Sequence, residues 1–491
     1  MVTGFVVETM AARGLGAKVY GDFHFLNNFF QQSVSLLEFG SMIAFYTKLS
    51  RRQAEAKLVR FYWLYVAVTV ALLFIAVFAA WAAGQASTLW PAQSMSSIGL
   101  AVSFAAVLWL ANVAGKITDA YGFTVPAEKA RMVLRLSAVF ILAGLFFSGY
   151  FSLTGYFIWN VMASLALFGA FARVVVRSGQ SFAGRALSGE AKEYVREFYT
   201  FCHPLIVFGI ISAAATLADI WMLQHFAGSI EQGYYGLALR ISAVCLVFTT
   251  AMTPLIAREF AVAHAQQNRQ RMIELFLGKI PQLYVITAIL AAFVFVHADT
   301  VAILIGGNQY HDAAPAVAIL ALYPLQQTYG QLSGSIFYAT EQTALYRNIG
   351  AASIVAGVPL SYFLLSDHLH WGMNAGAIGL AAKTVIVSAV AINVQLYFNT
   401  RLLGLYLWRL MLHQLVTLVT CLLLAATSRL LIEHTINVSS PFVRLIGAAV
   451  IYMSFLAGSL YFFPAWAGLS WEVLRRLSKE LINPKYKEHH P

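Results

Sequence analysis

Amide and carboxylate side chains recur along one side of an apolar stretch near the start of the chain, residues 19–46. Steps of three and four residues separate them, which places them on one face of an α-helix. Because the row extends over more than two turns, we favour the wall of an aqueous cavity over a single helix–helix contact held by polar side chains. The row consists of Asn28, Gln31, Ser35 and Glu38.

A second polar row lies in the apolar stretch 313–339. Two glycines in the same stretch allow another helix to approach closely. This row either lines a cavity or joins two helices, and both interpretations remain open. The row consists of Gln327, Gln331, Tyr338 and Glu341, and the glycines are Gly330 and Gly334.

Two cations stand within apolar stretches, where lipid makes an unpaired charge costly. Lys383 is flanked along the chain by alanine and valine, so its ammonium group requires water or an anion. Arg240 lies just inside its stretch, and its planar guanidinium matches the oxygens of a phosphate. The alternative for Arg240 is an interfacial side chain that reaches the lipid headgroups, and both interpretations remain open.

Two further charges each have a double interpretation. Lys116 follows the apolar stretch 94–115, where it either captures an anion or anchors the helix at the cytoplasmic surface. Asp219 lies deep in the stretch 201–226. It either pairs with Arg240 across a short turn or titrates with a transported ion. Both are functional candidates because charges inside membrane helices are rare.

The composition of the chain requires a lipid environment for these side chains. Of its 491 residues, 60% are hydrophobic and 11% charged, against roughly 25% charged in soluble proteins, and the mean hydropathy is +0.71. The net charge of +11 fits basic cytoplasmic loops better than nucleic-acid binding. Three distant cysteines without metal-ligand spacing predict neither a metal site nor a disulfide framework. Nucleotide-binding and hydrolase motifs are missing, so we expect a transporter without a cofactor rather than an enzyme.

Apolar segments of about 20 residues, long enough to span a bilayer, recur along the whole chain. They predict an all-α polytopic membrane protein with about 13–14 transmembrane helices. Residues 1–12 are the back half of one more helix, and we expect a further segment to precede Met1. The full segments are 19–46, 59–83, 94–115, 131–152, 154–176, 201–226, 234–257, 280–305, 313–339, 346–365, 375–399, 405–431 and 442–466.

Lysine and arginine alternate between the links that join these segments. Every second link is basic, and the links between them, such as 84–93 and 227–233, have no lysine or arginine. The positive-inside rule therefore places the basic links in the cytoplasm. Two outer links break this rule, and their basic residues are Arg13, Lys18, Arg429 and Arg444.

The longest polar link before the tail divides the chain into two pseudo-symmetric six-helix lobes. A Tyr-Gly pair opens the second helix of each lobe, Tyr20-Gly21 and Tyr235-Gly236, as expected for parallel repeats. The predicted parts are an N-terminal lobe at 1–176, a cytoplasmic linker at 177–200, a C-terminal lobe at 201–400, two peripheral helices at 401–467 and a basic amphipathic tail at 468–491.

The stretch ARGLGAKVYGDF, residues 11–22, predicts a reversal of the chain at the outer face. Gly14 and Gly16 supply it, because glycine tolerates positive φ. The three charges of this stretch, Arg13, Lys18 and Asp22, are expected in the wet interface.

Three stretches resemble, in order and spacing, the signature of the Wzx-type polysaccharide flippases of the MOP superfamily. ARGLGAKVYGDF is similar to the A-R-x-L-G-x-x-x-Y-G motif that follows the first helix of that family. TLADIWMLQHFAGSIEQGYYGLALR is similar to its seventh-helix aspartate, short turn and G-x-Y-x-x-A-x-R element. LIGGNQYHDAAPAVAILAL is similar to its later G-x-x-Y-x-x-A-x-P element. The likeness extends over essentially the whole chain in helix count and polarity, and the incomplete first helix departs from it.

The resemblance implies a function and a set of partners. Such a protein translocates an undecaprenyl-pyrophosphate-linked oligosaccharide across the bacterial inner membrane by alternating access, for exopolysaccharide or O-antigen synthesis. Membrane lipids, a polysaccharide polymerase and a chain-length regulator are the implied partners. The alternative is a MATE-like antiporter of drugs, metabolites or cations, whose pore should favour acidic groups.

The candidate residues take roles under the flippase interpretation. Cations hold the pyrophosphate, polar rows contact the glycan, and carboxylates couple transport to an ion gradient. The expected substrate-binding residues are Asn28, Gln31, Glu38, Lys116, Arg240, Gln327, Gln331 and Lys383, and the expected ion-coupling residues are Asp219, Glu38 and Glu341. No catalytic residue is expected.

Overall fold

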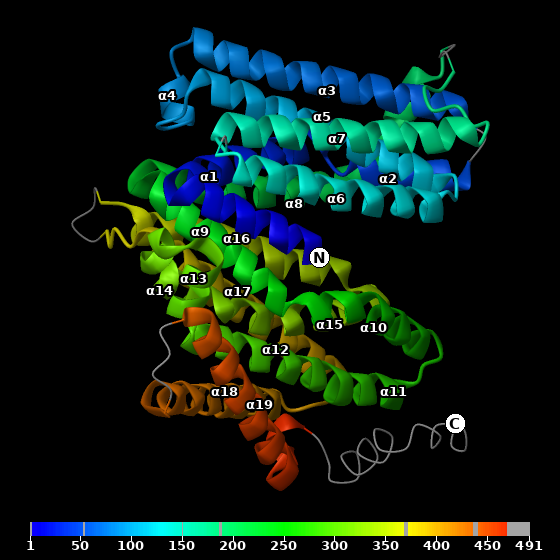
Figure 1. The fold of residues 1–491 in the computed structure, drawn as a ribbon. Coiled ribbons are helices and arrows are strands. Elements are labelled where there is room, and N and C mark those ends of the chain that lie inside the picture. The colour runs from blue at the N-terminus through cyan, green and yellow to red at the C-terminus, as the bar shows by residue number, and fades with distance from the viewer. Residues whose placement is uncertain are drawn as a thin grey trace. The chain divides into compact units, whose positions relative to one another are not determined.

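The computed structural model describes residues 2–52, 55–149, 151–185, 189–367, 372–435 and 440–468. Within these ranges every regular element is a helix, as the hydropathy predicts (Figure 1). Ten of the described helices are long and apolar enough to cross a membrane. The chain is therefore an all-α, multi-pass membrane protein. The predicted basic tail lies outside the described residues except for Gly468.

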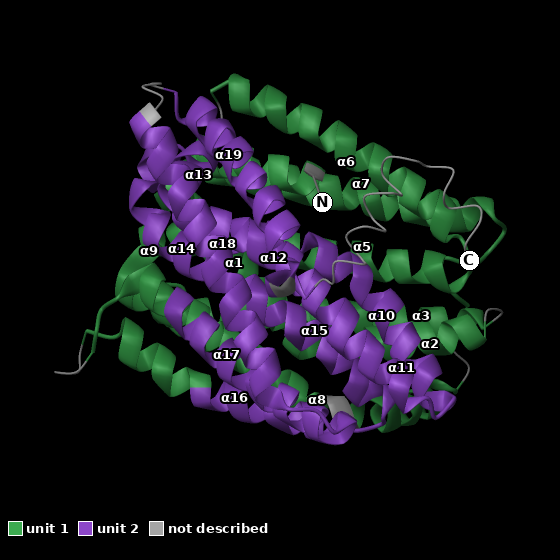
Figure 2. Ribbon diagram, turned by 90° about the horizontal axis from the view of Figure 1, so that it is seen from below, with its two compact units in different colours: residues 1–236, 357–380 green, residues 237–356, 381–491 purple. Residues whose placement is uncertain are grey.

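The chain forms two compact units (Figure 2). Unit 1 contains residues 1–236 and 357–380, and unit 2 contains residues 237–356 and 381–491. The first part of unit 1 continues past the predicted linker, so the long helix that follows the linker groups with the N-terminal helices. Three helices each contribute to both units, because the divisions after residues 236, 356 and 380 fall within them.

Unit 1 is built around α5, which packs along α7 and also contacts α1 and α2. Serine side chains begin two of its helices: Ser94 accepts a hydrogen bond from the Ser97 amide and Ser152 accepts one from the Gly155 amide, both at 3.2 Å. Its elements are α1 (Val2–Glu38), α2 (Ser41–Arg51), α3 (Ala56–Ala82), α4 (Ala86–Leu89), α5 (Met95–Ala120), α6 (Thr124–Phe147), α7 (Leu153–Arg177), α8 (Ala191–Met222) and the π-helical turn η1 (Leu223–Ala227).

Unit 2 is built around α12, which packs against α15 and α18. Three helices are divided between the two units: α9 (Gly228–Cys245), α16 (Thr343–Leu365) and α17 (Gly376–Leu403). The remaining elements are α10 (Val247–Ala265), α11 (Arg269–Glu274), η2 (Leu275–Lys279), α12 (Ile280–Val296), α13 (Ala298–Gly306), η3 (Asn308–Ala313), α14 (Ala314–Ala321), α15 (Tyr323–Ala339), α18 (Leu407–Thr435), α19 (Pro441–Phe462) and η4 (Pro464–Ala467).

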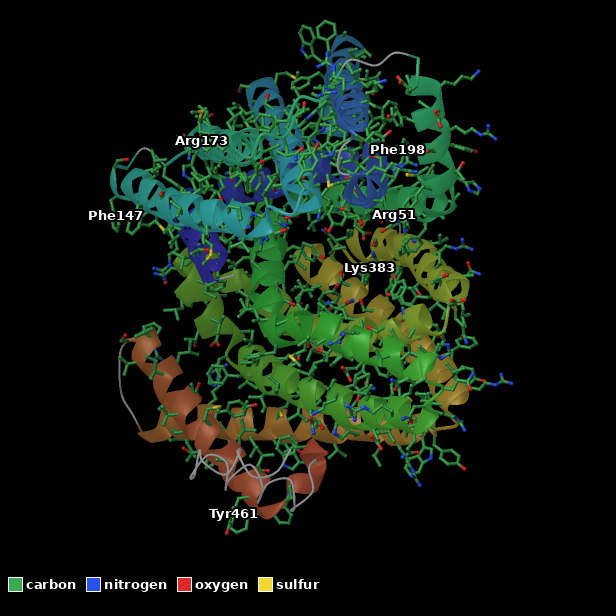
Figure 3. The ribbon with its side chains drawn as sticks, turned by 90° about the vertical axis from the view of Figure 1, so that its right-hand side faces the viewer. Arg51, Phe147, Arg173, Phe198, Lys383 and Tyr461 are labelled. Atoms are coloured by element: carbon green, nitrogen blue, oxygen red, sulfur yellow. The ribbon has the colours of Figure 1, made fainter. Side chains whose placement is uncertain are left out.

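Large apolar side chains cover the outside of these helices. Phe140 and Phe147 on α6 are 75% and 83% exposed, and Tyr461 on α19 is 67% exposed. Figure 3 labels Phe147 and Tyr461. Soluble folded proteins rarely expose so many large apolar side chains to water. The same groups are stable against lipid, which agrees with the spans predicted from hydropathy.

Several predicted spans are interrupted in the structure. The span 234–257 breaks between α9 and α10, and 280–305 breaks at His297, between α12 and α13. The span 313–339 breaks at Leu322, and Pro324 lies in the first turn of α15, which begins at Tyr323. The span 19–46 breaks at Phe39 and Gly40, whose φ angles are 51° and 74°. Hydropathy does not detect such breaks, because the residues on both sides are equally apolar.

One exception to the positive-inside rule has a structural explanation in unit 2. The guanidinium of Arg429 donates to both carboxylate oxygens of Asp299, at 2.9 and 3.1 Å, and to the carbonyl oxygen of Val296 at 2.6 Å. It also pairs with Glu433 at 2.9 Å. Its charge is therefore neutralised locally. Asp299 thereby joins α13 to α18.

Candidate functional site

Two glycines give α1 and α9 the same local backbone. Gly16 has φ 79° and ψ 166°, and Gly228 has φ 83° and ψ −177°. The Tyr20 hydroxyl donates to Glu8 at 2.8 Å, across twelve residues, which in a straight helix would span about 18 Å. The helix therefore kinks sharply at Gly16, one of the two glycines predicted to turn the chain.

Gly14 has a different role from the one predicted. Its backbone does not have positive φ, so it does not make the turn. A Cβ at Gly14 would lie 2.6 Å from Cδ1 of Phe151 and 3.0 Å from Cδ2 of Phe146. The missing side chain therefore makes room for the ring of Phe146 in the last turn of α6 and for the ring of Phe151 after that helix.

Within unit 1, small residues allow α1 and α9 to cross so closely that their backbones touch. A Cβ at Gly21 would overlap the carbonyl oxygen of Ser229 and lie 2.8 Å from the Gly233 nitrogen. A Cβ at Gly233 would overlap the carbonyl oxygen of Ala17. The two contacts are reciprocal, since Ala17 precedes Gly21 by one turn as Ser229 precedes Gly233. We call these four residues the glycine crossing.

The glycine crossing corrects the predicted alignment of the repeats. Gly21 corresponds to Gly233, and the positive-φ glycines before them also correspond. The predicted match of Tyr20-Gly21 to Tyr235-Gly236 is out of register by about one helical turn. Gly236 instead leaves space for the ring of His24, which a Cβ there would approach to 2.7 Å.

Asp22 lies beside the glycine crossing and connects three parts of unit 1. Its Oδ1 accepts from the Ser229 hydroxyl at 2.5 Å and from Nε2 of Gln93 at 2.6 Å. Gln224 donates in turn to Ser229 at 2.9 Å, with only 2% of its side chain exposed. The sequence placed Asp22 in the wet interface. The structure instead makes it a half-buried acceptor that joins α1 to the start of α9 and to the link between α4 and α5.

The polar row of α1 keeps its predicted face but uses its polar groups in different ways. Asn28 donates to the carbonyl oxygen of His24 in its own helix at 2.7 Å. Gln31 has a buried Nε2 without a hydrogen-bond acceptor in the described structure. Glu38 ends the helix, and its Oε1 accepts from the Met42 amide at 3.3 Å. Gln31 thus has the most unused hydrogen-bonding capacity of the three.

Lys116 lies in the last turns of α5, facing α2. Its ammonium nitrogen is 5.2 Å from the centre of the Tyr46 ring, a cation–π distance. The side chain is half-buried, and Asn112 one turn earlier is exposed. This contact holds the cation on the α2 side of α5, without deciding between anion capture and anchoring.

Asp219 has a hydrogen-bonding partner inside unit 1. The Ser361 hydroxyl, from the unit 1 portion of α16, donates to its Oδ1 at 2.5 Å. Glu231 similarly accepts from the Ala377 amide at 2.7 Å, where its charge favours the beginning of α17. Asp219 and Arg240 belong to different units, so their predicted pairing stays a prediction.

The second polar row lies on α15 in unit 2. Gln331 accepts from the Thr253 hydroxyl of α10 at 3.3 Å, and Gln327, one turn earlier, is half-buried. A Cβ at Gly330 would lie 2.9 Å from Ile392 of α17, which confirms the close approach predicted for this glycine. Glu341 does not extend the row, because α15 ends at Ala339 and Glu341 lies exposed in the following turn.

Both predicted cations of unit 2 lie on helices. Lys383, on α17, is only 9% exposed (Figure 3), and Arg240, on α9, is exposed. Burial of Lys383 next to Ala381, which is fully buried, is the costlier arrangement in a membrane helix. Lys383 is therefore the predicted site residue whose placement most needs a functional reason.

An ionic cluster of unit 1 lies among the basic links assigned to the cytoplasm. Glu197, near the start of α8, pairs with Lys48 at 3.0 Å and with Arg52 at 3.1 Å. Tyr194 donates to Glu55 at 2.6 Å, and Lys57 pairs with Glu190. These contacts join the α2–α3 link to the start of α8. The sequence identified the basic links but did not reveal which acidic residues pair with them.

This cluster makes the stability of unit 1 depend on pH. Burial alone raises the pKa of Glu197, but hydrogen bonds from Lys48 and Arg52 and their charges outweigh it and lower that pKa. A depressed carboxyl pKa stabilises the fold above the unfolded value of 4.5 and stops doing so as pH falls through the folded value.

Glu197→Gln should therefore lower the unfolding temperature at pH 7 and reduce the loss of stability that the wild type shows below pH 4.5. Thermal unfolding of the purified protein between pH 7 and pH 3.5 checks this, with Glu193→Gln as the control, since Glu193 is exposed one turn earlier on α8. Equal acid sensitivity of wild type and Glu197→Gln would contradict the assignment.

Comparison with known proteins gives structural matches without sequence matches. No protein-family model and no curated protein sequence matches the chain. A lipid II flippase MurJ structure in an inward closed conformation matches with a TM-score of 0.68 at 11% identity, over 94% of this chain and 96% of MurJ. An inward-facing multidrug resistance MATE family transporter of the MOP superfamily matches with a TM-score of 0.66 at 14% identity, over 82% of this chain and 94% of the transporter.

A third match is a MOP superfamily transporter from Pyrococcus furiosus, whose binding pocket is described as having reversed polarity. Its TM-score is 0.54 at 14% identity, over 82% of this chain and 92% of that protein. Identities this low establish the fold alone. The chain therefore has the fold shared by MOP superfamily transporters and the lipid II flippase MurJ.

Proposed function

We propose that this chain is a flippase that moves a polyprenyl-pyrophosphate-linked oligosaccharide across the bacterial inner membrane for surface polysaccharide synthesis. The observation that carries the proposal is the extent of the MurJ match, 94% of this chain against 82% for the MATE match. The chain thus corresponds almost end to end to a protein named for moving a lipid across a membrane. The Wzx-like motifs supply the glycan and the polyprenyl carrier in this proposal.

The charges of the candidate residues favour an anionic substrate. Lys383, Arg240 and Lys116 would hold the pyrophosphate, because ammonium and guanidinium groups pair with phosphate oxygens. The amides of Gln31, Gln327 and Gln331 suit sugar hydroxyls. A MATE-like exporter of cations is the second candidate, since a MATE transporter matches with nearly the same TM-score, but a cation within its pore would oppose a cationic substrate.

Alternating access would expose the substrate site to each side of the membrane in turn. Asp219, Glu38 and Glu341 are the proposed carboxylates for coupling to an ion gradient. Flipping in vesicles should then respond to an imposed proton or sodium gradient, and each carboxylate-to-amide variant should lose part of that response. A rate that is independent of every imposed gradient would remove ion coupling from the proposal.

The function is tested by deleting the gene in its own bacterium and measuring both surface polysaccharide and the leaflet position of the undecaprenyl-linked oligosaccharide. Accumulation on the inner leaflet is expected, with rescue by wild type and not by Arg240→Ala or Lys383→Ala at equal membrane level. Arg135→Ala on α6 is the matched control, since Arg135 is exposed outside the candidate site. If the deletion strain made normal polysaccharide but became more sensitive to cationic drugs, the flippase proposal would be wrong and the exporter proposal would take its place.

A further inference from the structure

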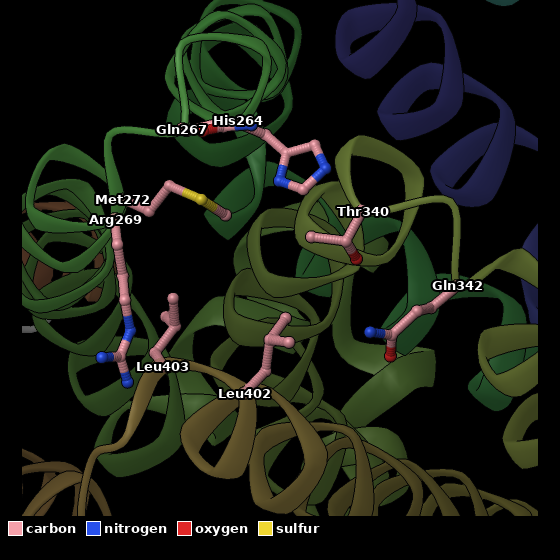
Figure 4. Close-up of a pocket in the computed structure, with 8 residues that line it drawn as sticks. All are labelled: His264, Gln267, Arg269, Met272, Thr340, Gln342, Leu402 and Leu403. Carbon is pink, nitrogen blue, oxygen red and sulfur yellow. The ribbon is translucent and has the colours of Figure 1, made fainter.

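Unit 2 contains a small pocket whose residues do not belong to the candidate transport site. Its volume is about 340 Å³ (Figure 4). Three segments line it: the end of α10 with the turn into α11, the turn between α15 and α16, and the last turn of α17. The turn into α11 belongs to a link that lysine and arginine assign to the cytoplasm. The pocket therefore opens near the inner surface of the membrane.

Arg269 is held at one side of this pocket by the end of α17. Gly404, with φ 66°, ends that helix, and the Leu405 amide donates back to the Thr400 carbonyl at 2.8 Å. A Cβ at Gly404 would overlap Nη2 of Arg269, so the guanidinium lies directly against the helix end. The partial negative charge of a helix C-terminus favours a cation there. The end of α17 therefore holds the guanidinium of Arg269 in position before any ligand binds.

The polar lining of the pocket selects for negative charge. Its polar side chains are Arg269, His264, Gln267, Thr340 and Gln342, and no carboxylate is among its lining residues. The nearby acids Glu259 and Glu274 pair instead with Arg271, at 3.7 and 3.5 Å. A guanidinium beside amide and hydroxyl donors is the combination that binds phosphate oxygens most effectively.

The rest of the lining is apolar and suits an amphiphile. Met272 and Leu403 are 5% and 2% exposed, whereas Leu402 is 39% exposed. Exposed apolar side chains continue along α17 at Val394 and Tyr397. The volume is at the lower end of the range for ligand pockets, about 300–1,000 Å³, so it holds a headgroup and not an oligosaccharide.

We propose that this pocket binds a phosphate-bearing anion, namely the headgroup of an anionic phospholipid from the inner leaflet. Arg269 pairs with the phosphate, Gln267, Gln342 and Thr340 contact the hydroxyls of the headgroup, and Leu402 contacts the start of an acyl chain. This inference is independent of the proposed flippase activity, since none of these residues belongs to the candidate transport site. Free phosphate esters share the chemistry, and the experiment below separates the two sources.

The test uses the full chain purified in neutral detergent. Binding of phosphatidylglycerol is measured by native mass spectrometry and by the shift in unfolding temperature, beside phosphatidylcholine and glycerol 3-phosphate. Arg269→Ala should weaken phosphatidylglycerol binding about tenfold or more, because a charged hydrogen-bonded pair is lost. Leu402→Gln should weaken binding of the lipid but not of glycerol 3-phosphate.

Arg271→Ala is the matched control, because Arg271 lies on the same helix, is exposed and is occupied by Glu259 and Glu274. Preference for phosphatidylglycerol that only Arg269→Ala and Leu402→Gln reduce supports the proposal. Binding of glycerol 3-phosphate alone keeps the phosphate site but overturns the lipid as its occupant. Equal loss in Arg269→Ala and Arg271→Ala, or no difference between phosphatidylglycerol and phosphatidylcholine, overturns the proposal.

Discussion

Gly21→Ala and Gly233→Ala should each prevent correct assembly of unit 1. In both variants the new methyl group overlaps a backbone carbonyl oxygen, that of Ser229 or of Ala17. A flexible side chain could rotate away, but a carbonyl within a helix moves only if the helix moves. Overpacking of a well-packed site costs about 1–3 kcal/mol and sometimes more, and we expect these two variants at or above the upper end.

The measurement is the yield of monodisperse protein in mild detergent, followed by its unfolding temperature. Gly99→Ala on α5 is the control, because a Cβ there meets no atom within 4 Å. Alanine also favours a helix over glycine by up to about 1 kcal/mol, so Gly99→Ala should be neutral or stabilising. Wild-type yield and unfolding temperature in Gly21→Ala would show that α1 and α9 do not cross at these residues.

The pattern of small residues in the sequence could have indicated this crossing. Ala17 and Gly21 are four residues apart, as are Ser229 and Gly233, and this spacing is typical of closely packed membrane helices. The Tyr-Gly pairs drew attention to the correct stretches but to the wrong register. The tyrosines defined the predicted match, but the glycines decide which parts of the two helices can touch, because they have no Cβ.

Helical class, membrane location and the turn at Gly16 could be predicted because they depend on local composition and on one residue's φ preference. The interruption at His297 could not be predicted, because tertiary packing decides where an apolar run bends. The interruption at Leu322 had a visible sequence signal in Pro324. A span count from hydropathy therefore merges short helices that the fold keeps apart.

Polar partners were the least predictable feature of the site. Asp22 was visible as a charge, but its contacts with Gln93 and Ser229 join residues far apart in the chain. Arg429 shows the same limitation, since the sequence marked it only as an exception to the positive-inside rule and did not identify its partner Asp299. Residue type indicates which groups need partners in a membrane, whereas only the three-dimensional arrangement identifies the partners.

Lys383→Met should abolish transport while leaving insertion and folding nearly intact. Lys383 is 9% exposed on an apolar helix, and methionine fills a similar volume without a charge to bury. If the ammonium group serves an anionic substrate, its removal costs the pairing with the pyrophosphate, and we expect at least a tenfold loss of flipping. Lys383→Arg keeps the charge and should keep a substantial part of the rate.

The unfolding temperature separates this role from a structural one. Removing one member of a buried ion pair leaves the other charge uncompensated and costs about 3–5 kcal/mol. A purely structural Lys383 would therefore give a Lys383→Met protein with a much lower unfolding temperature and a flipping defect no larger than its loss of folded protein. A substrate-binding Lys383 gives the opposite result, a flipping defect much larger than the loss of folded protein. Flipping rate per folded molecule, measured beside unfolding temperature for Lys383→Met and Lys383→Arg, distinguishes the two.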